Sequence, residues 1–398
     1  MATQGGDGQV RRLGAVLREG EQVTPLELFF DLVFVLAVTQ CTALMAATPT
    51  WEGLAKGMLA LGMLWWAWVG YAWLTSVVNP EEGVVRLAMF GAMAALLVVA
   101  LCVPEAFEDL GLTFAVAYGM VRAGQLLLFL VAGRDAPDLR RSVWTGLVPS
   151  TALGVGLLVA ASTLDGVAQG ATWAAALALD MLGPYLFGAE GWKLSPHHFA
   201  ERHGLVVIIA LGESVVAIGV GSGAGVDGGV ITAAVLGIVL LASMWWAYFD
   251  VVALVAERRL ADAPVGKVQN EMARDSYSFL HFPMVAGIVL IALGLKQTIA
   301  EVDAPLRSET AFALVGGLAL YLLAHVAFRY RNVRTVNVQR LLLAVGLLAA
   351  VPVADEPDAL LTLAGVAGAS VALIAYEAIR YSAGRERVRH LAAPSSPG

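Results

Sequence analysis

The chain has 398 residues, of which 59% are hydrophobic and 14% are charged, and its mean hydropathy is +0.74. No ordinary soluble domain approaches this composition, so the sequence predicts a polytopic membrane protein. The formal net charge of −7 results from an uneven distribution of the two signs along the chain, and it therefore says little about partners. We expect the lipid bilayer to surround the protein, and we expect no nucleic acid to bind.

The N-terminal segment at 1–23 is polar and contains Arg11 and Arg18. The first apolar run then carries Glu27 and Asp31, and no small-residue cleavage site follows it. This pattern differs from that of a cleavable signal peptide. We therefore expect residues 1–23 to form a tail that stays attached to the first membrane span.

Apolar runs of membrane-spanning length follow one another along the chain. A helix needs about 20 predominantly apolar residues to cross a bilayer. Measured against that length, the fold class is all-α, with about twelve transmembrane helices. The predicted spans are residues 26–46, 54–77, 84–104, 112–132, 143–163, 171–189, 203–222, 229–254, 275–298, 309–330, 338–353 and 359–381.

The links between the predicted spans alternate in charge. One set collects lysine and arginine, for example Arg140 and Arg258, whereas the other set has only Lys56 and Arg307 and gathers acidic residues. The positive-inside rule places the arginine-rich links in the cytoplasm. Because the predicted count is even, both termini are expected on that same side, including the C-terminal tail at 382–398.

Common catalytic and energy-coupling motifs are missing from the sequence. It contains no nucleotide-binding P-loop, no HExxH zinc motif and no GxSxG elbow. Their absence argues against ATP-driven pumping by this chain alone and against the commonest hydrolase reactions. We expect no cofactor and no bound metal.

Two short patterns recur six predicted spans apart. The stretch LWWAWVG at 64–70 resembles MWWAYFD at 244–250, and a tyrosine stands four residues before a basic side chain in both the fourth and the tenth span. The second pattern comprises Tyr118, Arg122, Tyr321 and His325. Matches at one span offset suggest two parallel six-helix halves, at 24–200 and 201–381, with the tryptophans packed between them. Chance recurrence of tryptophan near a membrane interface is the alternative.

Three motifs resemble signatures of the bacterial low temperature requirement A family. They are TPLELFFDLVFV at 24–35, ERHGLVVIIALGES at 201–214 and SFLHFPMV at 278–285. The resemblance extends from about residue 20 to about residue 380. It implies a multi-pass protein of a bacterial cytoplasmic (inner) membrane, and it implies neither a particular substrate nor a catalytic residue.

Ionisable side chains inside the predicted spans form the candidate site, which we interpret as a substrate or ion pathway. A charge at mid-depth in the bilayer costs roughly 2.5 kcal/mol or more by insertion scales, so it persists only where protein or water compensates it. The candidates are Glu27, Asp31, Arg122, Asp180, Glu213, His281 and His325.

The two acids of the first span stand four residues apart and therefore on one helix face. Glu27 and Asp31 can line an inner vestibule, but Glu27 can equally serve the N-terminus of a helix that begins after Thr24 and Pro25. His203 is expected at the membrane interface, where the seventh span begins.

The deeper candidates also allow two interpretations. Arg122 needs a carboxylate, which Asp180 or Glu213 can supply at similar depth, and such a pair can be functional or can simply lock helices together. His281 and His325 can relay protons or act as hydrogen-bonding core residues. Pro283 should disturb its helix and expose carbonyls that need partners.

Three hypotheses for function follow from these groups. The first is a secondary transporter or permease that moves an unknown small molecule or ion by proton or ion coupling. The second is an intramembrane enzyme that acts on a lipid or isoprenoid, although no DDxxD motif is present. The third is a non-catalytic scaffold or sensor whose polar groups only hold helices together. The sequence favours transport over catalysis.

Overall fold

The computed structural model describes residues 22–81, 83–186, 192–383 and 385, and every regular element in these residues is a helix. The predicted all-α fold class is therefore confirmed for this part of the chain. The α-helices are α1 (Pro25–Ala47), α2 (Trp51–Val77), α3 (Gly83–Cys102), α4 (Gly111–Ala132), α5 (Pro137–Ser142), α6 (Val148–Ala161), α7 (Gly166–Leu186), α8 (Pro196–Gly221), α9 (Gly228–Phe249), α10 (Val252–Ala261), α11 (Lys267–Ala273), α12 (His281–Ala300), α13 (Ser308–Val333), α14 (Val338–Ala350) and α15 (Ala359–Arg380).

Ten helical segments among the described residues are long and apolar enough to cross a membrane. Four of them join consecutive elements: α3 with the 3-10 turn Val103–Glu105, α5 with α6, α9 with α10, and α11 with α12. Two further helices, α7 and α14, lie where the sixth and eleventh spans were predicted and are not among the ten. The membrane-protein character is therefore supported, and the count of twelve crossings stays a prediction.

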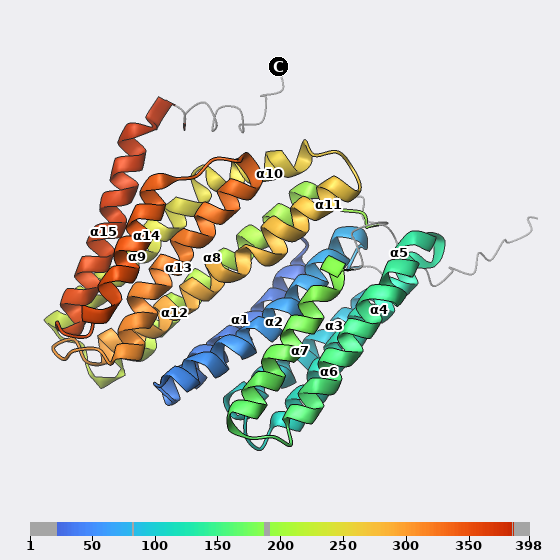
Figure 1. Cartoon of the computed structure of the whole chain (residues 1–398), viewed down its shortest axis with the longest axis horizontal. Helices are drawn as coiled ribbons and strands as arrows, with labels where there is room; N and C mark the ends of the chain where they lie inside the picture. Colours follow the sequence, from blue (N-terminus) through green and yellow to red (C-terminus); the bar gives the residue numbers. More distant parts are fainter. Residues whose placement is uncertain (1–21, 82, 187–191, 384, 386–398) are drawn as a thin grey trace, which may run out of the picture.

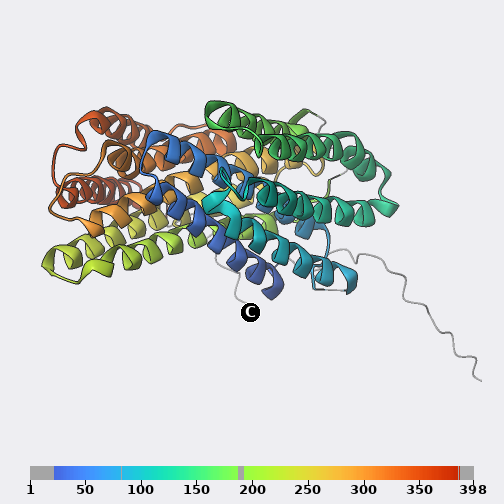
Figure 2. The same cartoon turned by 90° about the horizontal axis from the view of Figure 1, so that it is seen from below.

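The long helices lie side by side with their axes roughly aligned, as Figures 1 and 2 show. Helices α1 and α2 occupy the middle of Figure 1, between α3–α7 on one side and α8–α15 on the other. In that position α1 and α2 both pack against α8 and α12. The two parts of the chain are thus joined through α1, α2, α8 and α12.

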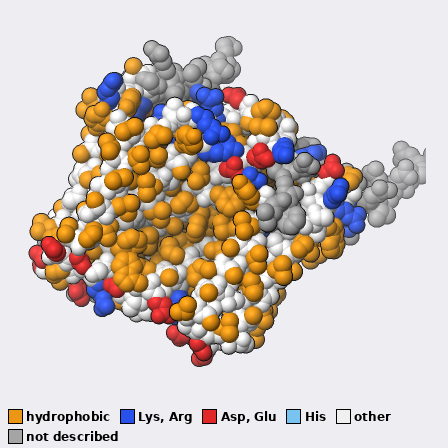
Figure 3. All heavy atoms as spheres, viewed as in Figure 1, with side chains coloured by type: hydrophobic (Ala, Val, Ile, Leu, Met, Phe, Trp, Pro, Cys, Tyr) orange, Lys and Arg blue, Asp and Glu red, His pale blue; other side chains and the backbone are white. Residues whose placement is uncertain are grey.

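The surface has a broad apolar zone between two charged ends. In Figure 3 hydrophobic side chains cover the middle of the molecule, most lysine and arginine gather at the upper end, and aspartate and glutamate predominate at the lower end. Large apolar side chains such as Leu87 (68% exposed) and Ile379 (80% exposed) lie open on this surface. An apolar zone of this extent is expected where a protein contacts lipid.

The start of α1 follows from its sequence. Thr24 precedes the helix in extended conformation, Pro25 takes the first helical position, and the Thr24 and Glu27 side chains cap one another's backbone N–H groups. This reciprocal arrangement is a capping box. The interpretation of Glu27 as a helix-terminus residue is confirmed, although capping is only part of its role.

Helix α8 begins at Pro196, well before residue 203, where the seventh span was expected. The additional residues carry His198 and Arg202 into the protein, and both side chains are fully buried. His203 is fully buried among neighbouring side chains as well, and its expected depth at the membrane interface stays a prediction. The later start of the span was expected because a charged residue was taken to end an apolar span, whereas acids on α1 neutralise Arg202.

The recurring tryptophan motif is used differently in its two copies. Trp65 and Trp66 on α2 are buried, but Trp245 and Trp246 on α9 are 46% and 39% exposed. The expectation that both copies pack between the halves is wrong for the second, because the side of α9 that carries Trp245 and Trp246 is partly exposed.

A π-helical segment at Arg274–Phe279 connects α11 to α12 and ends just before Pro283. Its carbonyl groups have side-chain partners: Trp65 Nε1 donates to the oxygen of Ser278 at 2.8 Å, and His281 Nδ1 donates to that of Ser276 at 3.0 Å. These bonds supply partners to two carbonyls that precede Pro283. In an α-helix the N–H that Pro283 lacks would pair with the carbonyl of Phe279, so the expectation for Pro283 stays a prediction.

Candidate functional site

Arg202 on α8 is the centre of a buried ionic cluster with α1. Its Nη1 lies 3.0 Å from Glu27 Oε1, and its Nη2 lies 2.7 Å from Asp31 Oδ1. His198 Nε2, one helical turn earlier on α8, lies 2.8 Å from the same Glu27 oxygen. We call these four residues the α1–α8 cluster.

Helix α2 supports the cluster from a third side. Thr75 accepts a hydrogen bond from Arg202 Nη1 at 3.0 Å, and Trp68 Nε1 donates to Asp31 Oδ1 at 2.8 Å. The Trp68 ring also lies 5.5 Å from the guanidinium of Arg202. One oxygen of Asp31, Oδ2, is buried without a hydrogen-bond partner among the described residues. The cluster thus compensates most, but not all, of its buried polar atoms.

Arg122 on α4 pairs with Asp180 on α7, as one of the two predicted pairings requires. The Nη2–Oδ1 distance is 2.8 Å, and both side chains are only 1% exposed. Tyr118 donates to Asp180 Oδ2 at 2.8 Å, and Thr151 contributes a hydroxyl between the two partners. Arg122 Nη1 donates to Gln125 Oε1 at 2.6 Å. The guanidinium is therefore held by three side chains, Gln125, Thr151 and Asp180, from three helices.

Glu213 does not join Arg122 and Asp180. Its Oε2 accepts a hydrogen bond from the hydroxyl of Thr39 on α1, and the side chain is buried. Within the described part of the chain it forms no ion pair. The alternative pairing of Glu213 with Arg122 is therefore wrong, because α8 places Glu213 against α1 and away from α4.

His281 lies in a buried group of aromatic rings. Its Nδ1 donates to a backbone carbonyl, so its Nε2 accepts the hydroxyl hydrogen of Tyr248 at 2.8 Å. The rings of His203 and Tyr277 lie 5.3 Å and 5.0 Å from the His281 ring. This bonding pattern is that of a neutral core histidine, and the proton-relay role stays a prediction.

His325 on α13 belongs to a third ionic group, which the sequence did not reveal. Its Nδ1 accepts from Arg340 Nη1 at 2.9 Å, and Arg340 makes a two-pronged contact with Glu377 on α15 at 2.9 and 2.8 Å. Arg340 stands near the start of the span predicted at 338–353, and Glu377 stands near the end of the span predicted at 359–381. Both are buried, because the ends of α14 and α15 pack against α13.

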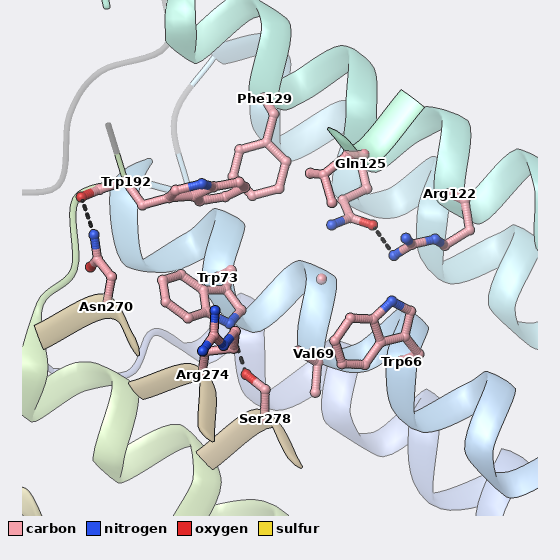
Figure 4. A pocket seen from close by; sticks show the side chains of 12 residues that line it. Trp66, Val69, Trp73, Arg122, Gln125, Phe129, Trp192, Asn270, Arg274 and Ser278 are labelled. Atoms are coloured by element: carbon pink, nitrogen blue, oxygen red, sulfur yellow. Dashed lines mark hydrogen bonds between the residues drawn. The ribbon is translucent and has the colours of Figure 1, made fainter. Parts of the chain in front are cut away.

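A cavity opens between α2, α4 and the segment from α11 to α12, and Figure 4 shows it from close by. Its empty volume, which includes open solvent at its mouth, is about 520 Å³. Aromatic rings form much of its wall, and Arg122 and Gln125 stand at one side. The lining residues are Trp66, Val69, Gly70, Trp73, Arg122, Gln125, Phe129, Leu147, Trp192, Asn270, Arg274 and Ser278.

Hydrogen bonds hold the cavity wall in place. Trp73 Nε1 donates to Ser278 Oγ at 2.9 Å, and Asn270 Nδ2 donates to the backbone oxygen of Trp192 at 2.9 Å. Arg274 forms an ion pair with Asp275 at 2.8 Å. These bonds join α2 and the segment before α8 to the segment before α12, so the cavity lies at a junction of the two parts of the chain.

The candidate residues occupy separate places. Of the seven, only Arg122 lines this cavity, Glu27 and Asp31 belong to the α1–α8 cluster, and the others lie elsewhere. The sequence did not predict the cavity, because the tryptophans of α2 were expected to pack between the two halves. Among the described residues, no three histidine, cysteine or acidic side chains lie close enough together to hold a metal ion.

Comparisons with known proteins agree with the motif resemblance. The profile of the family described as bacterial low temperature requirement A protein matches residues 22–377. An uncharacterized protein of Rhizobium meliloti (strain 1021) is 29% identical over 307 residues, which cover 74% of each chain. No solved structure matches the chain.

Proposed function

The chain belongs to the bacterial low temperature requirement A family, and from that premise we propose that it is a secondary transporter or permease of the bacterial inner membrane. It moves a small molecule or ion by coupling to protons or ions, with both termini in the cytoplasm. The cavity beside Arg122 is the observation that carries this proposal. A transporter requires a site between its helices that reaches a charged side chain in the middle of a spanning helix.

The proposed architecture has twelve crossings in two parallel halves, in which α7 and α14 also span the membrane. Neighbouring helices support this division. In the first half α1 contacts α2 and α3, α4 contacts α3 and α6, and α7 contacts α2 and α6. In the second half α8 contacts α9 and α12, α13 contacts α12 and α14, and α15 contacts α9 and α14. The same pattern of neighbours thus recurs when α1 is matched with α8.

The α1–α8 cluster gives independent support for the two halves. Glu27 contacts His198 and Asp31 contacts Arg202, and both pairs are separated by 171 residues. Where two equivalent helices meet at a two-fold axis, residues at equivalent positions face each other. The start of α8, Ser195 followed by a proline, also corresponds to Thr24 followed by a proline at α1. We therefore place the start of the second half near Ser195 rather than at 201.

Alternating access then takes place by movement of one half against the other along α1 and α8. The ionic pairs of the cluster lie on the proposed axis, where a rocking motion displaces atoms least. The cluster can therefore remain intact while the cavity opens and closes. Its role in this scheme is that of a pivot.

Glu213 is the proposed coupling group. Unlike the acids of the cluster, it has a hydroxyl partner and no ion pair within the described residues. A carboxylate at this depth without a paired cation is stabilised by binding a proton or a metal cation. It also lies on the contact between α1 and α8, where proton binding can be linked to movement of the halves.

The experiment is a proton-flux measurement with the purified protein in sealed liposomes. A pH gradient should collapse faster with the wild-type protein than in empty vesicles, and Glu213→Gln should abolish the difference. The matched control is Glu301→Gln, an exposed acid beyond the end of α12, which should leave the flux unchanged. A gradient that the wild-type protein leaves intact, or a flux that survives Glu213→Gln, contradicts the proton-coupled mechanism.

A further inference from the structure

The polar groups that point into the cavity are mainly hydrogen-bond donors. Figure 4 shows the amide nitrogen of Gln125 turned toward the middle of the cavity, while its oxygen is turned toward Arg122. The indole N–H of Trp66, unlike that of Trp73, is not used in a hydrogen bond within the described part of the protein. Arg274 brings a guanidinium to the wall. A ligand that satisfies these groups must offer acceptors.

The charged side chains that line the cavity also favour an anion. None of the described lining residues is acidic, whereas two are arginines. The carboxylates that pair with them, Asp180 and Asp275, are not part of the lining. Each ion pair therefore turns its positive end toward the cavity, and an anion gains from both.

The apolar part of the wall limits the shape of the ligand. Trp66, Trp73, Phe129 and Trp192 surround the cavity with flat rings. Flat rings bind an aromatic body best by stacking or edge contacts. The cavity therefore has hydrogen-bond donors on one side and aromatic rings on the rest of its wall.

From these features we infer that the cavity binds an aromatic monocarboxylate, with the carboxylate between Gln125 and Arg274 and the ring among the tryptophans. The identification of this ligand as the transported substrate rests on the proposed function. The binding itself does not.

The test uses three probes that share one ring and differ in charge: benzoate, benzyl alcohol and benzylammonium. Binding to the purified full-length protein in nanodiscs is measured by equilibrium dialysis. We expect benzoate to bind at least tenfold more tightly than benzyl alcohol, and benzylammonium to bind more weakly than either. Equal affinity for benzoate and benzyl alcohol overturns the inference, as does a preference for the cation.

Two arginines that pair with the same acid provide matched variants. Arg274 lines the cavity, whereas Arg331 contacts Asp275 at 3.0 Å without lining it. Arg274→Gln should weaken benzoate binding about tenfold and leave benzyl alcohol binding unchanged, and Arg331→Gln should do neither. Equal losses of benzoate affinity in both variants overturn the assignment, provided that their melting temperatures agree.

The outcomes separate this inference from the proposed function. If benzoate binds with this selectivity but does not accumulate in liposomes, the inference stands and the proposal that this ligand is transported is wrong. Proton flux without selective benzoate binding supports transport and overturns the inference.

Discussion

Removal of Arg202 should destabilise the protein far more than removal of either acid beside it. Arg202→Gln leaves two buried carboxylates close together without their guanidinium, and loss of one partner of a buried pair costs about 3–5 kcal/mol. Asp31→Asn should cost less than half as much. In that variant Glu27 still neutralises Arg202, and the amide oxygen can still accept the hydrogen bond from Trp68.

The assay is thermal unfolding of the detergent-solubilised protein, followed by tryptophan fluorescence. The double variant Arg202→Gln with Asp31→Asn should recover part of the loss, because only one carboxylate then needs compensation. Arg331→Gln is the control: its ion pair with Asp275 is roughly a quarter exposed, and such pairs contribute about 0–1 kcal/mol. If Arg202→Gln is as mild as this control, or if the double variant is no better than the single one, the account of the cluster is wrong.

Two glycines should resist enlargement for different reasons. Gly70→Ala places a Cβ against Gln125 Nε2, so the Gln125 side chain must turn away. Equilibrium dialysis should then show weaker benzoate binding, and unchanged binding would argue against a role for Gln125. Gly287→Ala places a Cβ 2.6 Å from the backbone oxygen of Gly317 and should lower stability by about 1–3 kcal/mol, because α12 and α13 must separate. Gly156, which has open space around it, serves as its control, and a Gly287→Ala melting temperature equal to that of Gly156→Ala would refute the close contact.

Depth along a span was a good guide to some contacts in this protein. It brought Arg122 and Asp180 together, because both lie near the middle of apolar runs and a buried guanidinium needs a carboxylate. Depth alone left Glu213 as an equal candidate. The choice between Asp180 and Glu213 depends on which helix each face of α8 packs against. A hydropathy pattern does not contain this information.

The missed residues share one physical origin. Arg202 and Arg340 stand near the ends of apolar runs, where an arginine normally reaches water, so neither was among the candidate site residues. Each is buried because an acid from another helix lies beside it. Their signal in the sequence was the acid in a distant span, and Glu27, Asp31 and Glu377 provided it without naming the partner.

The α1–α8 cluster also bears on how the protein is made. Glu27 and Asp31 on α1 leave the ribosome before Arg202, which follows only after α7 has been synthesised. Until then two carboxylates of α1 are without the cation that neutralises them. A chain that ends after α7 therefore lacks the groups that compensate the acids of α1, and completion of α8 supplies them.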